Sequence, residues 1–192
     1  YTSAVSVSDS SVIGSAGYFN NITIQNNNIQ KGEFGIDILA VKSTGNGSGT
    51  VISQNLMNST AGNALSEGGI YLEGVDGALI SQNNVGNFNA ATAEVDYGVW
   101  IALGCRNITV DKNVIHDIRY TGTSGYTGQG LMVSTGESSA NVTISNNMFY
   151  AIIGDADSYV TFGAAYSPVA IYLYGSSPVS QTGINIYYNT IF

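Results

Sequence analysis

Several titratable side chains lie close together in one short stretch of the sequence. They include the chain's single histidine and three of its five cations, and they are Arg106, Asp111, Lys112, His116, Asp117 and Arg119. A lysine or histidine base can abstract the C5 proton of a sugar while an arginine neutralises a uronate carboxylate, as in a polysaccharide lyase. The simpler interpretation is that Asp111 and His116 face solvent beside a corner and pair with their neighbours. No catalytic residue is therefore predicted, and if the protein is an enzyme we expect its catalytic residues among Asp111, Lys112, His116, Asp117 and Arg119.

The charge balance excludes some classes of partner. The 192 residues carry five Lys and Arg against 13 Asp and Glu, which gives a formal net charge of −8. Such a chain lacks the basic surface that nucleic acids and anionic membranes attract, and it repels polyanionic substrates. No stretch approaches the roughly 18 consecutive apolar residues that span a membrane. We predict neither nucleic-acid binding nor membrane insertion.

Aromatic side chains recur at one position of a repeated segment that reads small residue, apolar, any, apolar. Its copies are residues 4–7, 35–38, 69–72, 98–101, 130–133 and 170–173. If these copies are neighbouring strands about 4.8 Å apart, Tyr71, Trp100 and Tyr172 lie in one outward column. Aromatic rings on a flat sheet can stack against sugar faces without any cation. The alternative is an aromatic ladder that lies under loops and only stabilises the sheet.

Two longer stretches, 116–130 and 150–168, are rich in Tyr, Gly and Ser and enlarge two of the repeats. Insertions in repeat proteins often map to the binding face, so Tyr120, Tyr126 and Tyr159 join the candidate ligand-binding residues. Asp155 and Asp157 could hold Ca²⁺ through oxygen ligands, but an Asp-x-Asp pair alone is more typical of a polar turn. We predict no metal and no cofactor.

These residues need a scaffold, and a second repeat indicates which one. Six segments align on an Asn, usually with apolar residues five and three positions before it and two after. The aligned residues, spaced by 28, 28, 30, 34 and 42 positions, are Asn27, Asn55, Asn83, Asn113, Asn147 and Asn189. From the apolar residue three positions before the Asn to the one two positions after it is a step of five, an odd number. On a straight strand this step would turn the second apolar side chain outward, so the chain must bend near the Asn. Asn tolerates the left-handed conformation of a sharp corner. We expect these side chains to form a hydrogen-bonded ladder from coil to coil.

Units of this length without a helical period cannot bury their own apolar faces and must stack. We predict an all-β, single-stranded parallel β-helix of about five to six coils, forming one domain over residues 1–192. Both ends of the chain lie within the repeat pattern and show no polar cap. Either the chain is a segment of a longer one, or copies associate end to end.

The corner of Ile-Thr-Ile-x-Asn-Asn type, repeated six times, resembles the right-handed parallel β-helix repeats of the pectate-lyase-like superfamily. The segments INIYYNTIF at 184–192 and NVIHDI at 113–118 are similar to β-helix modules of large secreted bacterial surface proteins. The resemblance covers residues 4–192 and implies a right-handed solenoid in an extracellular or cell-surface setting. It implies no single function, because the superfamily holds lyases, hydrolases, epimerases, adhesins and non-catalytic carbohydrate binders.

The superfamily's usual catalytic motifs are absent from this sequence, which has no Arg-x-Pro-x-x-Arg, no Asn-Thr-Asp with Gly-His-Gly, and no Asp-Pro-His. The sequence therefore favours a non-catalytic, extracellular or cell-surface scaffold for adhesion or polysaccharide binding. Two alternatives stay open. One is a polysaccharide lyase or glycoside hydrolase, and the other is a structural repeat that assembles end to end into filaments.

Overall fold

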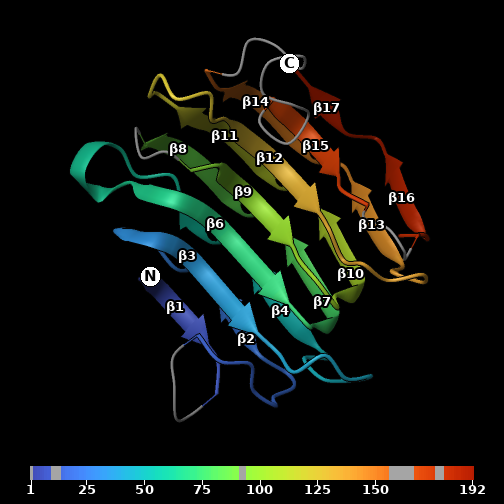
Figure 1. The fold of residues 1–192 in the computed structure, drawn as a ribbon. Helices are drawn as coiled ribbons and strands as arrows, with labels where there is room; N and C mark the ends of the chain where they lie inside the picture. Colours follow the sequence, from blue (N-terminus) through green and yellow to red (C-terminus); the bar gives the residue numbers. More distant parts are fainter. Residues whose placement is uncertain (1, 10–13, 91–93, 156–166, 176–179) are drawn as a thin grey trace.

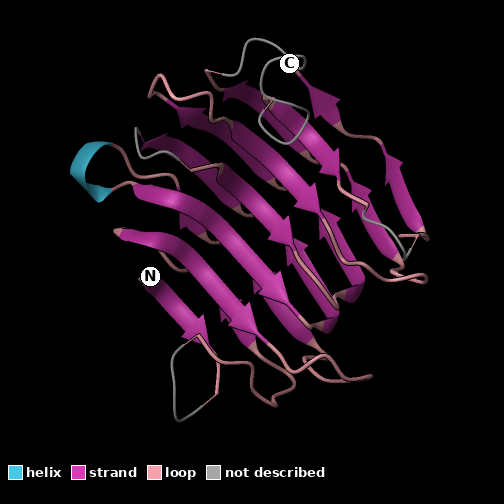
Figure 2. Cartoon of the chain, viewed as in Figure 1, coloured by secondary structure: helices cyan, strands magenta, loops and turns pink. Residues whose placement is uncertain are grey.

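The computed structural model describes residues 2–9, 14–90, 94–155, 167–175 and 180–192. In this part of the chain almost all regular structure is β, with one short 3-10 helix, η1 (Ala61–Asn63), before the third coil. Figure 2 shows the strands stacked in layers that run the length of the molecule. No helix among the described residues is long and apolar enough to cross a membrane.

Three parallel sheets form the walls of a solenoid (Figure 1). The first sheet, called sheet 1, consists in order of β1 (Ser3–Val7), β3 (Gly32–Leu39), β6 (Leu65–Glu73), β9 (Asp96–Ile101), β12 (Gly128–Val133) and β15 (Val169–Leu173). Sheet 2 consists of β2 (Thr23–Gln25), β4 (Thr50–Ser53), β7 (Asp76–Ser81), β10 (Arg106–Asp111), β13 (Val142–Ser145) and β16 (Ile184–Tyr187). Sheet 3 consists of β5 (Leu56–Met57), β8 (Asn84–Ala90), β11 (Val114–Tyr120), β14 (Met148–Ile153) and β17 (Thr190–Ile191).

The predicted fold class is confirmed, since each strand pairs in parallel with the equivalent strand one coil away. The solenoid has about four turns, slightly fewer than the five to six coils expected. Sheets 1 and 2 have six strands each, and this number includes the strands of the coils at the two ends. The enlarged coils are less irregular than expected, because β11, β12 and β14 take up parts of 116–130 and 150–168.

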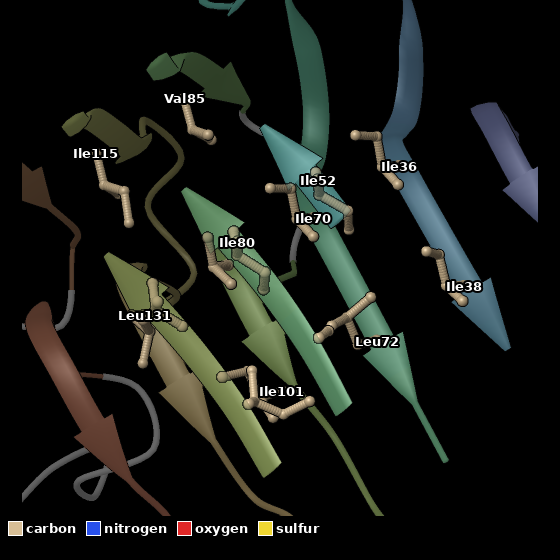
Figure 3. Close-up of a cluster of buried hydrophobic side chains, with 14 of the residues drawn as sticks. Ile36, Ile38, Ile52, Ile70, Leu72, Ile80, Val85, Ile101, Ile115 and Leu131 are labelled. Carbon is tan, nitrogen blue, oxygen red and sulfur yellow. The ribbon is translucent and has the colours of Figure 1, made fainter. Parts of the chain in front are cut away.

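The solenoid interior is filled by columns of branched aliphatic side chains. In sheet 1, Ile36, Ile70, Val99 and Leu131 occupy equivalent rungs and are all at most 1% exposed. Figure 3 shows Ile52 and Ile80 of sheet 2 facing Ile70 and Leu72 of sheet 1. Burial of each such side chain stabilises the fold by about 1.5–3 kcal/mol. The period-two pattern of the sequence therefore places these residues in the core.

The Asn ladder is present, but the bend that accompanies it lies one residue earlier than expected. At each of these corners the residue that precedes the repeated Asn has a left-handed φ angle of 55° to 58°; these residues are Asn26, Gln54, Gln82, Lys112, Asn146 and Tyr188. The prediction that the repeated Asn itself adopts this conformation was wrong. Its side chain is instead turned inward, where its amide replaces the backbone hydrogen bonds that the corner interrupts.

Each ladder side chain connects successive coils. The Nδ2 of Asn27, Asn55, Asn83, Asn113 and Asn147 donates to the Oδ1 of the next ladder Asn at 2.9–3.0 Å, as far as Asn189. The same Oδ1 also accepts the backbone N–H of the preceding ladder residue, as Asn83 Oδ1 does from Asn55 at 3.0 Å. Four of the six are at most 1% exposed. A directional amide chain therefore fixes the register of sheets 2 and 3 at every turn.

Candidate functional site

The aromatic column predicted from the sequence exists on the outer face of sheet 1. Tyr71 of β6 lies opposite Trp100 of β9, and Trp100 lies opposite Met132 of β12. Met132 in turn lies opposite Tyr172 of β15, so it separates Tyr172 from Trp100. Asp37 of β3 continues the column at its other end, beside Tyr71.

The rings of this column are not coplanar. Tyr71 and Trp100 have ring centroids 5.0 Å apart with planes at 84°, an edge-to-face contact. Tyr97, also on β9, lies closer to Trp100, at 4.6 Å and 30°. Tyr71, Tyr97 and Trp100 are all partly exposed, and we call these three residues the aromatic patch. The patch presents adjoining aromatic surfaces in more than one orientation, which a sugar ring and its substituents can contact.

Phe34 forms the floor of this patch. Its ring lies 5.9 Å from that of Tyr71 and is only 4% exposed. The absence of a side chain at Gly68 makes room for it, because a Cβ there would lie 2.4 Å from Phe34 Cε1. Phe34, Gly68 and Tyr97 occupy equivalent rungs, so a second column runs beside the predicted one.

Sequence reasoning missed Tyr97 and Phe34 for a geometric reason. Strict alternation places Tyr97 and Trp100, three residues apart, on opposite faces of a strand. The two rings nevertheless contact each other, because the strand departs from strict alternation at Gly98. A small residue at the start of each repeated segment was the available signal for this irregularity.

The polar ends of the patch are held in place by neighbouring side chains. Trp100 Nε1 donates to Ser134 Oγ at 2.8 Å, and Tyr71 Oη donates to Glu73 Oε2 at 2.8 Å. Glu73 also pairs with Lys42 at 2.7 Å. Burial acts to raise the pKa of the Glu73 carboxyl, but the hydrogen bonds from Lys42 and Tyr71 outweigh it and lower that pKa below its usual value. The rings are thus oriented before any ligand arrives, which reduces the entropic cost of binding.

Of the two described loop tyrosines, Tyr120 is less accessible than the patch, whereas Tyr126 is partly exposed. Tyr120, at the end of β11, is only 3% exposed, and its Oη accepts the backbone N–H of Ser124. Its ring packs edge-on against Tyr126 at 5.7 Å, so Tyr120 supports the loop rather than presenting a ring to solvent. Tyr159 lies outside the described residues.

The weak Ca²⁺ candidates gain no support from the described part of the chain. Asp155 Oδ2 accepts the backbone N–H of Gly125 at 3.0 Å, which links two coils as a polar turn does. Asp157 lies outside the described residues. Among the described residues, no group of three His, Cys, Asp or Glu side chains is arranged to hold a metal ion.

The predicted polar cluster divides into separate hydrogen-bonded groups. At the corner between β10 and β11, Lys112 Nζ pairs with Asp111 at 3.1 Å. Asp111 also accepts hydrogen bonds from Ser145 and Asn146 of the next coil. Burial acts to raise the pKa of Asp111, but these hydrogen bonds and the Lys112 charge lower it. The Lys112 side chain is largely exposed, and Asp111 joins two coils.

The other group lies along β11. His116 Nδ1 is 2.8 Å from Asp117 Oδ2, and its Nε2 is 2.8 Å from Asn84 Oδ1. The His116 ring stacks on Tyr150 at 4.9 Å and is largely buried, so the expectation that His116 faces solvent was wrong. Arg119 Nε donates to the same Asp117 at 3.0 Å. Burial acts to raise the pKa of Asp117, but the bonds from His116 and Arg119 lower it.

A hollow of about 220 Å³ lies beside this second group. Its lining residues are Thr60, Ala61, Asn87, Phe88, Asp117 and Arg119. His116 is not among them, and both of its ring nitrogens already have oxygen partners. A general base needs a free nitrogen within reach of a substrate proton. The five residues named for the case that the protein is an enzyme therefore fall into two separate hydrogen-bonded groups.

Comparison with known proteins agrees with this geometry. A family model described as a right handed beta helix region matches residues 1–191. Searches of curated proteins and of solved structures gave no match. The match covers nearly the whole chain and coincides with the stacked parallel strands, the aliphatic columns and the Asn ladder, so the protein belongs to the right-handed β-helix family.

Proposed function

We propose that this β-helix is an extracellular or cell-surface scaffold that binds a polysaccharide through the aromatic patch, without catalysis. The observation that carries the proposal is the position of Trp100, between Tyr71 at 5.0 Å and Tyr97 at 4.6 Å on the outer face of a rigid sheet. Adhesion is the biological role that such a scaffold would serve.

The chemistry of the patch favours a neutral or weakly charged glycan. Aromatic faces bind the apolar faces of sugar rings and need no ionic partner. The formal net charge of −8 opposes the approach of a strongly anionic polymer. Glu73, hydrogen-bonded to Tyr71, supplies an acceptor for sugar hydroxyls at one side of the patch.

The test uses the chain's single tryptophan as the probe. The protein is titrated with a panel of neutral and uronate polysaccharides while Trp100 emission is followed. We expect a saturable emission change with a neutral glycan. Tyr71→Ala should weaken that binding at least tenfold, because the edge-to-face neighbour of Trp100 is lost. Trp100→Ala, measured by calorimetry, should abolish it.

Tyr18→Ala is the matched control, because Tyr18 is 78% exposed and is not part of the patch. It should bind as the wild type does. If Trp100→Ala leaves the affinity for every bound glycan unchanged, the proposal fails. Absorbance of an unsaturated uronide that grows during the titration, and disappears in Lys112→Ala or His116→Ala, would favour the lyase instead. Sedimentation that shows concentration-dependent assembly without glycan binding would favour the filament role.

A further inference from the structure

Three acidic residues influence one another where the chain passes from sheet 3 into sheet 1. Gly68 of β6 lies opposite Tyr97 of β9, so Glu67, the third residue of β6, and Asp96, the first residue of β9, precede paired residues on neighbouring strands. Glu94 lies two residues before Asp96. We call Glu67, Glu94 and Asp96 the acidic corner. Twenty-seven or more positions separate Glu67 from the other two in the sequence, and only the stacking of coils brings them together.

Asp96 is the most constrained member of this corner. It is 1% exposed, and neither of its carboxyl oxygens has a hydrogen-bond partner within the described part of the chain. An ionised carboxylate in such a place would be buried without compensation, which is costly by several kcal/mol. Burial, with added repulsion from Glu67 and Glu94, raises the pKa of Asp96 to about 9. The residue therefore carries a proton at neutral pH.

Glu67 is the second member of this corner with a raised pKa. Burial, then the charge and the hydrogen bond of Glu94, raise the pKa of Glu67 to about 7.

The charged side chains around the corner do not offset this acidity. Glu33 of β3 adds a further negative charge near Glu67. Arg119, at the end of β11, is bound to Asp117 instead, and Asp155 of the next coil accepts the Gly125 N–H. The backbone carbonyl of Thr127, just before β12, accepts the Asp96 N–H at 3.0 Å.

The acidic corner adjoins the aromatic patch directly along the chain. Asp96 immediately precedes Tyr97, whose ring contacts Trp100. Glu67 immediately precedes Gly68, over which the Phe34 ring lies. Any shift at the start of β6 or β9 therefore changes the floor and one side of the patch.

We propose that the acidic corner is a proton-dependent switch: its protons keep β6 and β9 in the arrangement that presents Tyr97 and Trp100, and ionisation at alkaline pH displaces them. The ionised Asp96, repelled by Glu67 and Glu94, is buried and cannot be hydrated unless the start of β9 opens. The consequence for glycan affinity rests on the proposed function, but the displacement itself does not.

The first experiment follows Trp100 emission without glycan between about pH 5 and pH 9.5. The wild type should show a reversible change with its midpoint between about pH 7 and pH 9. Asp96→Asn should remove the alkaline part of the change, because the amide stays neutral. Glu137→Gln, which alters an acid paired with Arg106 at another corner, should behave as the wild type. If Asp96→Asn does not fold, Glu94→Gln serves instead and should remove the change near neutral pH.

A flat wild-type profile, or an identical change in Asp96→Asn, would overturn the proposal. The proposal would also fail if a few millimolar Ca²⁺ abolished the Trp100 emission change at constant pH, because the acidic corner would then bind a cation rather than protons. The second experiment measures glycan affinity at pH 6 and at pH 9. The glycan affinity of the wild type should fall at least tenfold from pH 6 to pH 9, and that of Asp96→Asn should change little. An emission change without glycan binding at either pH would reject the proposed function and leave the switch standing.

Discussion

Asn83 shows how one side chain serves two coils at once. Its Oδ1 accepts the backbone N–H and the Nδ2 of Asn55, both at 3.0 Å. Its Nδ2 donates to the Ile52 carbonyl and to Asn113 Oδ1, both at 2.9 Å. An Asp at this position could accept both bonds but donate neither, and a Gly could do neither. The ladder therefore requires an amide.

Asn83→Ala should destabilise the protein by about 3–5 kcal/mol, because four hydrogen bonds are lost and their partners are left buried. Chemical denaturation measures the change. Asn27→Ala, at the exposed end of the ladder, should cost less than about 1 kcal/mol, since water replaces its partners there. Similar losses at both positions would show that the interior ladder adds nothing beyond side-chain packing.

Four glycines at one equivalent position of sheet 1, Gly35, Gly69, Gly98 and Gly130, are an element-scale feature, because each one accommodates the next coil. A Cβ added to Gly98 would lie 2.5 Å from the Gly130 carbonyl oxygen and 2.5 Å from Ile115 Cγ2. Gly69 and Gly130 face the next rung in the same way. In the last coil the same position is Ala170, and no further described coil follows it. The requirement for glycine thus comes from stacking rather than from backbone conformation.

Gly98→Ala should therefore destabilise the protein by about 2–4 kcal/mol through overpacking. Gly62→Ala is the matched control, because a Cβ at Gly62 meets nothing within 4 Å, and it should change stability by less than about 0.5 kcal/mol. Thermal unfolding of both variants distinguishes them. An unchanged melting temperature in Gly98→Ala would mean that β9 and β12 can separate without cost.

The strands of sheets 1 and 2 could be predicted because their apolar residues follow a period of two, and this pattern recurs once per coil together with the ladder Asn. That regularity placed Tyr71 and Trp100 on one face correctly. The left-handed residue before each Asn could not be located, since Gln54, Lys112 and Tyr188 share no side-chain property. Tyr97 was missed because alternation fails at Gly98. The acidic corner was missed because no local pattern reports which side chains the coils bring together.

At the scale of the whole molecule, two classes of carboxyl group oppose each other as the pH changes. Glu73, Asp111 and Asp117 have lowered pKa values in the folded protein. They add stability above the unfolded pKa, and this stability is lost as the pH falls through their folded pKa values. Glu67 and Asp96 have raised values, of about 7 and about 9. They keep a proton that the unfolded chain has lost, so stability declines between about pH 4 and their folded pKa values.

The free energy of unfolding should therefore be greatest near pH 4 to 5 and should fall towards pH 9. Each retained proton contributes a slope of about 1.4 kcal/mol per pH unit. Asp96→Asn removes one such proton, so the variant should be more stable than the wild type at pH 8 by at least about 1.4 kcal/mol, and its profile should be flatter. Urea denaturation at pH 5, 7 and 8.5 measures both quantities. A variant less stable than the wild type at pH 8 would mean that the buried carboxyl is ionised and compensated in the folded protein. Its proton could then not control the aromatic patch.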